Sequence, residues 1–198
     1  MSSREAILAS LRRKHRPERV PLPQVGLFDR ELEGGPIAEF GRRLAQMGGK
    51  LLEPGPDGDP LAPAAPLLRE AVVICSMVPE VQGNRPLTPD TAPASLADVD
   101  VAVLRACFGV AETGSVCFTE EALGVNSVAY LAQHLLVLLD PAAILPNLHH
   151  AYRRPEFARS RYTVFHTGPS ATADIEGVLI HGAQGVRSLS VLLLPPPG

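Results

Sequence analysis

Three strand-like runs, at 71–77, 134–139 and 188–194, most constrain how this chain can fold. Each has the length and composition of a strand that is buried in a sheet. Helix-like segments alternate with these runs, at 36–47, 142–154 and 173–181. This alternation predicts an α/β fold with a largely parallel sheet flanked by helices.

The first part of the chain has a different character. Residues 3–15 have a thin apolar stripe on an otherwise basic helix, and Ser2 and Glu5 have the spacing of a capping box. Prolines at 17, 21 and 23 then interrupt the pattern. We expect a helical arm over 1–35 and one α/β domain over 36–198, since 198 residues are one domain's worth of chain.

Composition excludes several kinds of protein. A net charge of −3 gives no reason to expect nucleic acid as a partner. No apolar run reaches the ~20 residues that span a bilayer, and no secretory signal is seen, so we expect a cytoplasmic protein. The three cysteines form no C-x-x-C pair, which argues against a disulfide framework, a zinc site or an iron–sulfur site in this chain. Cys75, Cys107 and Cys117 are expected to be buried thiols.

The strong signatures of several enzyme classes are missing. The sequence has no G-x-x-x-x-G-K-[ST], G-x-G-x-x-G, H-E-x-x-H or G-x-S-x-G. Their absence disfavours a P-loop ATPase, a standard Rossmann dehydrogenase, a zincin and an α/β-hydrolase.

One candidate binding segment is the run of small residues at 168–176. It follows a strand-like run and opens a helix-like one, so turn N–H groups and the first helical turn would face one spot. The alternative is an ordinary capped strand-to-helix loop. The candidate ligand-binding residues here and just beyond the expected helix are Gly168, Pro169, Ser170, Thr172, Asp174, His181, Gly182, Gln184 and Gly185.

The other candidate segment is Ala-Glu-Thr-Gly-Ser at 111–115. A glutamate among small residues in an apolar context must be paired, hydrogen-bonded or protonated. Glu112 is therefore a candidate nucleophile, general base or acceptor, with Thr113, Gly114 and Ser115 as candidate ligand contacts. The alternative is an edge-of-sheet glutamate held by turn N–H groups.

We expect the two segments to share one pocket, because a lone carboxylate lacks positioning and a lone turn lacks reactive chemistry. A ligand that carries an acid group and a hydroxyl would suit this pair. The loop over 78–97 follows the end of a strand and is expected to close part of the pocket.

The segments 109–115, 168–176 and 182–185, in this order, resemble the lactate-utilization protein C family, whose shared unit is the LUD domain. The resemblance covers roughly residues 36–198. It implies an α/β fold like that of sugar-phosphate isomerases and coenzyme A transferases. The sequence departs from the family pattern at Gln184-Gly185-Val186 and at 123–126, which argues against direct anion binding.

The resemblance also implies a role in bacterial oxidation of L-lactate to pyruvate, beside iron–sulfur partner proteins that carry the clusters. On this hypothesis the chain is an accessory protein that binds a small ligand and holds no metal or cofactor itself. Two alternatives stay open. One is a free-standing transferase or isomerase that uses Glu112, and the other is a sensor of a hydroxy acid without catalysis.

Overall fold

The computed structural model describes residues 2–14, 21, 23–55, 58–88, 90–173, 179–181 and 185–197, with the backbone alone at 172, 173 and 179–181. Within this part the chain is an α/β protein whose core is a five-stranded parallel sheet. In sheet order its strands are β1 (Lys50–Leu52), β11 (Ser188–Leu193), β6 (His134–Leu139), β3 (Val101–Arg105) and β2 (Ile74–Ser76). The predicted fold class is confirmed.

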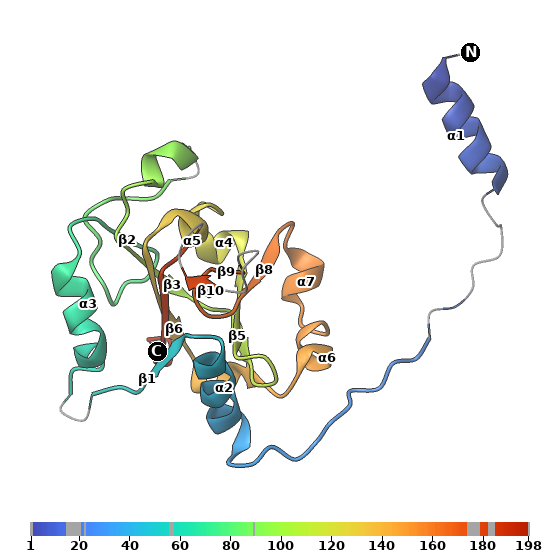
Figure 1. Ribbon diagram of the computed structural model, residues 1–198. Coiled ribbons are helices and arrows are strands. Elements are labelled where there is room, and N and C mark those ends of the chain that lie inside the picture. Colours follow the sequence, from blue (N-terminus) through green and yellow to red (C-terminus); the bar gives the residue numbers. More distant parts are fainter. Residues whose placement is uncertain are drawn as a thin grey trace.

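Alternation along the central strands builds the layers on both faces of this sheet. Val101 and Val103 of β3 pack on one face with α3 (Ala65–Glu70), whereas Ala102 and Leu104 pack on the other. That second face meets Phe40 and Leu44 of α2 (Gly35–Gln46). Figure 1 shows α3 on the side of the sheet away from the second sheet.

The second sheet is mixed, with four strands in the order β7 (Ile144–Leu145), β4 (Phe108–Val110), β5 (Ser115–Thr119) and β8 (Thr163–His166). Its inner face, with Val116 and Phe118, joins the core between the two sheets. Phe108 and Cys117 face the other way, toward α6 (Leu148–Ala151) and α7 (Glu156–Arg159). Four layers therefore follow one another from α3 to the α6–α7 pair (Figure 1).

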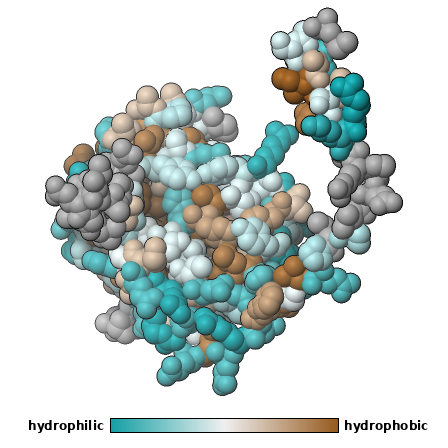
Figure 2. Space-filling model, turned by 45° about the vertical axis from the view of Figure 1, so that its right-hand side comes forward, coloured by the Kyte–Doolittle hydropathy of each residue, from teal (hydrophilic) through white to brown (hydrophobic). Residues whose placement is uncertain are grey.

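The remaining elements are short, apart from the first helix. They are α1 (Ser3–Lys14), α4 (Glu120–Leu123), α5 (Val128–Leu131), η1 (Ala62–Ala64), η2 (Pro93–Leu96) and η3 (Pro141–Ala143), with β9 (Ala171–Ala173) and β10 (Leu179–His181). The predicted capping box opens α1, since Glu5 N donates to Ser2 Oγ and Ser2 N donates to Glu5 Oε2. No residue of α1 is buried, and Figure 2 shows this helix apart from the body with apolar and hydrophilic residues side by side.

Two predicted helices are wrong, for local reasons. The described ends of the segment 173–181 are strands and not a helix. Ala171 pairs with His181 and Thr172 with Ile180 in an antiparallel ladder. In 142–154 only a short helix forms. Pro146 has no N–H to donate, and Asn147 instead caps α6 by accepting from the His150 N–H at 3.2 Å.

The run at 71–77 also differs from its expectation. It supplies β2, but β2 is an edge strand, Ile74 and Ser76 are only half-buried, and Val72 is 76% exposed. All three cysteines are free thiols; Cys75 and Cys117 are buried and Cys107 is half-buried. Burial raises the pKa of Cys117 to about 12. No helix in the described part of the chain is long and apolar enough to cross a bilayer.

Candidate functional site

The first motif forms the turn between β4 and β5. Ala111 N donates to Leu145 O at 2.8 Å, Glu112 N to Pro146 O at 3.1 Å, and Gly114 N to Val110 O at 2.9 Å. Gly114 has φ = +66°, and a Cβ there would lie 2.2 Å from the Leu44 nitrogen of α2. The side chains of this motif are small because the turn packs directly on the α2 backbone.

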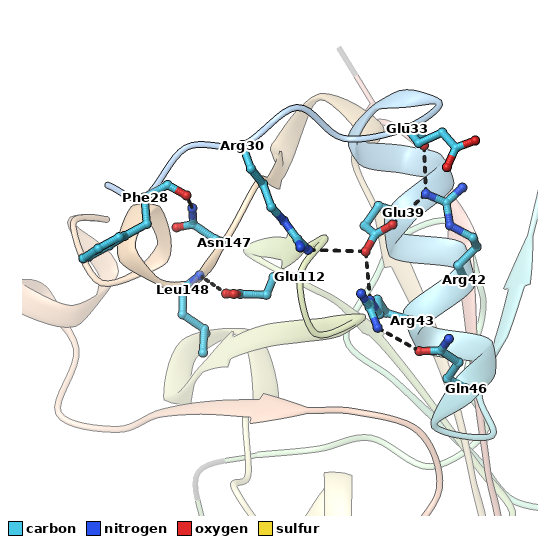
Figure 3. Close-up of polar contacts among 10 residues, drawn as sticks. All are labelled: Phe28, Arg30, Glu33, Glu39, Arg42, Arg43, Gln46, Glu112, Asn147 and Leu148. Carbon is cyan, nitrogen blue, oxygen red and sulfur yellow. Dashed lines mark hydrogen bonds and ion pairs between the residues drawn. The ribbon is translucent and has the colours of Figure 1, made fainter. Parts of the chain in front are cut away.

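Glu112 is exposed rather than enclosed, so the expected apolar surroundings of its carboxylate are wrong. Its Oε2 accepts a hydrogen bond from Leu148 N at 3.1 Å, in the first turn of α6. In Figure 3 the carboxylate points toward Leu148 and away from Glu39. This is a structural contact that satisfies one unpaired donor of a helix start. A catalytic role of Glu112 stays a prediction.

The second motif begins where β8 ends at His166. Gly168 has φ = +67°, and a Cβ there would lie 2.1 Å from Met47 O, so only glycine fits. Ser170 N donates to Val186 O at 2.9 Å, which ties the turn to the segment before β11. Gly185 approaches the Ser170 side chain so closely that a Cβ there would lie 3.0 Å from the Ser170 Cβ.

Of the remaining predicted residues, the structure describes the backbone of two. Thr172 lies on β9 and His181 on β10, so His181 does not stand at the end of a helix. Asp174, Gly182 and Gln184 lie outside the described residues. The ligand-binding roles of all these residues stay predictions.

The two motifs touch each other through hydroxyl groups. The Ser115 and Thr167 hydroxyls form a hydrogen bond, and Ser115 Oγ also donates to Thr113 Oγ1 at 2.8 Å. The structure thus brings Thr113 and Ser115 to the second motif. Glu112 instead faces α6, and no residue of 111–115 is among the described residues that line the cavity against the second motif.

A cavity of about 230 Å³ lies against the second motif. Its lining comprises Ala129, Tyr130, Phe165, His166, Thr167, Gly168, Pro169, Ser170 and Val186. Ala129 and Tyr130 precede β6 and Val186 precedes β11, so the cavity lies at the amino ends of the parallel strands. This placement is unusual, because open α/β sheets commonly bind ligands at the carboxyl ends.

None of the described residues of the loop at 78–97 lines this cavity, contrary to its predicted role as a cover. It folds back along β2. Asn84 Oδ1 accepts from Ile74 N at 2.8 Å, and Asn84 Nδ2 donates to Val72 O at 2.6 Å. The loop therefore satisfies the free edge of the five-stranded sheet.

Sequence reasoning did not place His166 among the candidate site residues. The side chain lines the cavity, is 9% exposed, and has an Nε2 without a hydrogen-bond partner in the described structure. Its ring contacts Tyr130 and Phe118, with centroids at 5.0 and 5.7 Å. Burial lowers the pKa of His166 to about 4, so the imidazole is neutral at pH 7. Its position directly before the turn was the available signal.

A larger cavity, of about 310 Å³, lies at the carboxyl end of β3 and contains none of the predicted site residues. Its lining is mainly apolar. Its guanidinium, on Arg105, is already engaged, since it pairs with Glu80 and donates to Leu194 O at 2.8 Å. We therefore consider the smaller cavity the better candidate site.

The segment at 25–30 lies over α6 and α2 beside the first motif (Figure 3). Asn147 Nδ2 donates to Leu27 O at 2.8 Å, and His150 Nε2 lies 2.6 Å from Asp29 Oδ1.

The same segment also reaches α2, where Arg30 lies 3.6 Å from Glu39. Hydrogen bonds from Arg42 and Arg43 hold the pKa of Glu39 below its ordinary value. Asn147 is a second residue that sequence reasoning missed.

The comparisons with known proteins agree with this architecture. The LUD domain family matches residues 90–194, just over half of the chain, and the chain belongs to this family. A crystal structure of a DUF162 family protein from Deinococcus radiodurans matches with a TM-score of 0.60 and 14% identity. The match covers 81% of this chain and 96% of that one, and it shows a shared fold. A search of curated proteins gives no match.

Proposed function

We propose that this protein is an accessory component of bacterial L-lactate oxidation to pyruvate and binds a small ligand where its two motifs meet. Membership of the LUD domain family, whose members are associated with lactate utilization, carries the proposal. The cavity at 165–170, with the first motif bonded to it through Ser115, supports ligand binding at this place.

The proposal assigns electron transfer to iron–sulfur partner proteins and places the complex in the cytoplasm. This chain would contribute a ligand site and a surface for its partners. In the part of the chain that the structure describes, no group of three or more His, Cys, Asp or Glu side chains is arranged to hold a metal ion.

A reconstitution tests the proposal. L-lactate-dependent reduction of an artificial electron acceptor is measured with iron–sulfur proteins of a lactate-oxidising system, with and without the chain. We expect the rate to fall when the chain is left out. Equal rates in both samples would contradict the proposal.

A variant pair then tests whether the site is needed. Ser115→Ala removes the hydroxyl that joins the motifs, whereas Ser95→Ala removes an exposed hydroxyl in a loop, bonded to Ala92 O. We expect Ser115→Ala to lower the reconstituted rate and Ser95→Ala to leave it unchanged. Equal effects of both variants on the rate would show that the contact between the two motifs is not needed for the function.

A further inference from the structure

We infer that the cavity beside the second motif binds an uncharged planar ring and that Nε2 of His166 forms a hydrogen bond with it. The inference rests on the proposed function in one respect, because it names the ligand class of the same site. The cavity lies between α5 and the end of β8, two elements that lie close together in Figure 1.

The unpaired nitrogen is the first argument. Buried polar side-chain atoms nearly always have a hydrogen-bond partner, and leaving one unpaired destabilises the fold. His166 Nε2 is buried without a partner in the described structure, yet its side chain lines a cavity. A ligand group in that cavity would supply the missing partner. The Tyr130 ring packs against the His166 ring and is itself 42% exposed.

The charge of the lining is the second argument. None of the described lining residues carries a charge at pH 7, since His166 is neutral. The Tyr130 hydroxyl is 2.6 Å from the Tyr162 hydroxyl, and the Thr167 hydroxyl is bonded to Ser115. Against these described residues a carboxylate or phosphate would lose its hydration without gaining a countercharge, which is costly. The ligand group that enters is therefore uncharged, contrary to the acid group that the sequence suggested.

The shape of the lining is the third argument. Tyr130, Phe165 and His166 bring three rings to a cavity of about 230 Å³, and the main chain of 167–170 forms another wall. Aromatic side chains favour offset or edge-on contact with another ring. A single heteroaromatic ring with an amide or hydroxyl substituent fits the volume of the cavity and carries no charge. It can also form a hydrogen bond with His166 Nε2.

The test uses a matched pair of probes, nicotinamide and nicotinate, which share a ring and differ in charge. L-lactate is the third probe. Binding to the whole chain is measured by ligand-observed NMR at pH 7. We expect nicotinamide to bind roughly tenfold more tightly than either anion. Nicotinate or L-lactate binding as tightly as nicotinamide would overturn the inference, and so would no binding of nicotinamide at millimolar concentration.

A variant pair assigns the hydrogen bond. His166→Phe keeps a ring but removes the nitrogen, and we expect it to weaken nicotinamide binding about tenfold. His149→Phe makes the same change at an exposed histidine outside the cavity and should have no effect. Unchanged affinity in a folded His166→Phe protein would overturn the role of Nε2. The probe selectivity of the unmodified protein tests the inference even where the variant does not fold.

The outcome is separable from that of the proposed function. A protein that does not select nicotinamide but is still needed for L-lactate oxidation would overturn the ring and leave the proposed function standing. A protein that selects nicotinamide through His166 but is not needed for L-lactate oxidation would overturn the proposed function and leave the ring-binding site standing.

Discussion

The side-chain hydroxyls of Ser115 and Thr167 are hydrogen-bonded to each other, although 52 residues separate them. Antiparallel pairing of β5 with β8 brings them together, since Val116 is the partner of His166 in the register. The two motifs that stand out in the sequence are therefore adjacent ends of neighbouring strands. Their closeness is a consequence of the sheet and does not depend on a ligand.

This hydroxyl pair gives the first prediction. We expect Thr167→Val to lower the free energy of unfolding by about 1 kcal/mol, because the variant keeps the shape but removes one partner of a hydrogen bond. Urea unfolding of the single variants Ser115→Ala and Thr167→Val and of the double variant measures the coupling. Strict additivity would show that the contact contributes nothing to stability.

The two tight glycines give the second prediction. At Gly114 and at Gly168 a Cβ would clash with the backbone of α2 or of the residue after it, and both have positive φ. We expect Gly168→Ala and Gly114→Ala to destabilise the protein by more than about 2 kcal/mol each. Gly58→Ala is the control, because Gly58 also has positive φ (+83°) but open space around it. Thermal unfolding that ranks the three variants equally would contradict the role of the close approach.

The third prediction concerns pH. Burial lowers the pKa of His166 to about 4 from its ordinary value of 6.5. As the pH falls below 6.5 the unfolded chain takes up a proton at this residue while the folded protein does not, so stability falls with falling pH down to about 4. The loss is about 3 kcal/mol at most. We expect His166→Phe to show a shallower loss than the unmodified protein in chemical unfolding between pH 7 and 4. Parallel curves would show that His166 is not buried as a neutral ring.

Asn147 gives the fourth prediction. Its side chain is 7% exposed and connects α6 to the backbone at Leu27 and Phe28. We expect Asn147→Ala to cost about 1–3 kcal/mol, because it removes the hydrogen bonds of a buried side chain to the Leu27 carbonyl and the His150 N–H. Amide hydrogen exchange in 23–30 should accelerate. Ser95→Ala, at an exposed hydroxyl bonded locally to Ala92 O, should change neither quantity by much.

Glu112 gives the fifth prediction. Its carboxylate accepts from the first turn of α6, and a glutamine oxygen can accept the same bond. We expect Glu112→Gln to leave stability within about 0.5 kcal/mol and Glu112→Ala to cost about 1 kcal/mol. Equal stability of the two variants, measured by urea unfolding, would remove the capping role.

The sequence predicted the core strands well because their burial is complete. The run that became β6 is apolar on both faces after His134, and the run that became β11 is apolar apart from Ser188 and Ser190. The burial of the strands beside them was harder to predict. The run at 71–77 is equally apolar, but it lies at the edge of the sheet, and edge position depends on strand order rather than on composition.

The segment at 173–181 was misread because capping residues and a short apolar run are shared by helices and strands. The antiparallel pairing of Ala171 with His181 makes the described ends of that segment strands. The places of His166 beside the cavity and of Asn147 at the start of α6 could not be read from spacing, since both depend on contacts with residues remote in the sequence. Only Pro146-Asn147, a proline followed by a capping residue, pointed to a helix start at that place.

The position of β11 has a consequence for how the protein is made. This strand comes last in sequence among the five, yet it lies between β1 and β6 and pairs with both. While the ribosome has not yet released residues 188–193, β1 has no neighbour and one side of β6 stays unpaired. Folding of the parallel sheet must therefore wait for nearly the whole of this sequence, and the wait leaves apolar strand edges open to chaperones or to aggregation.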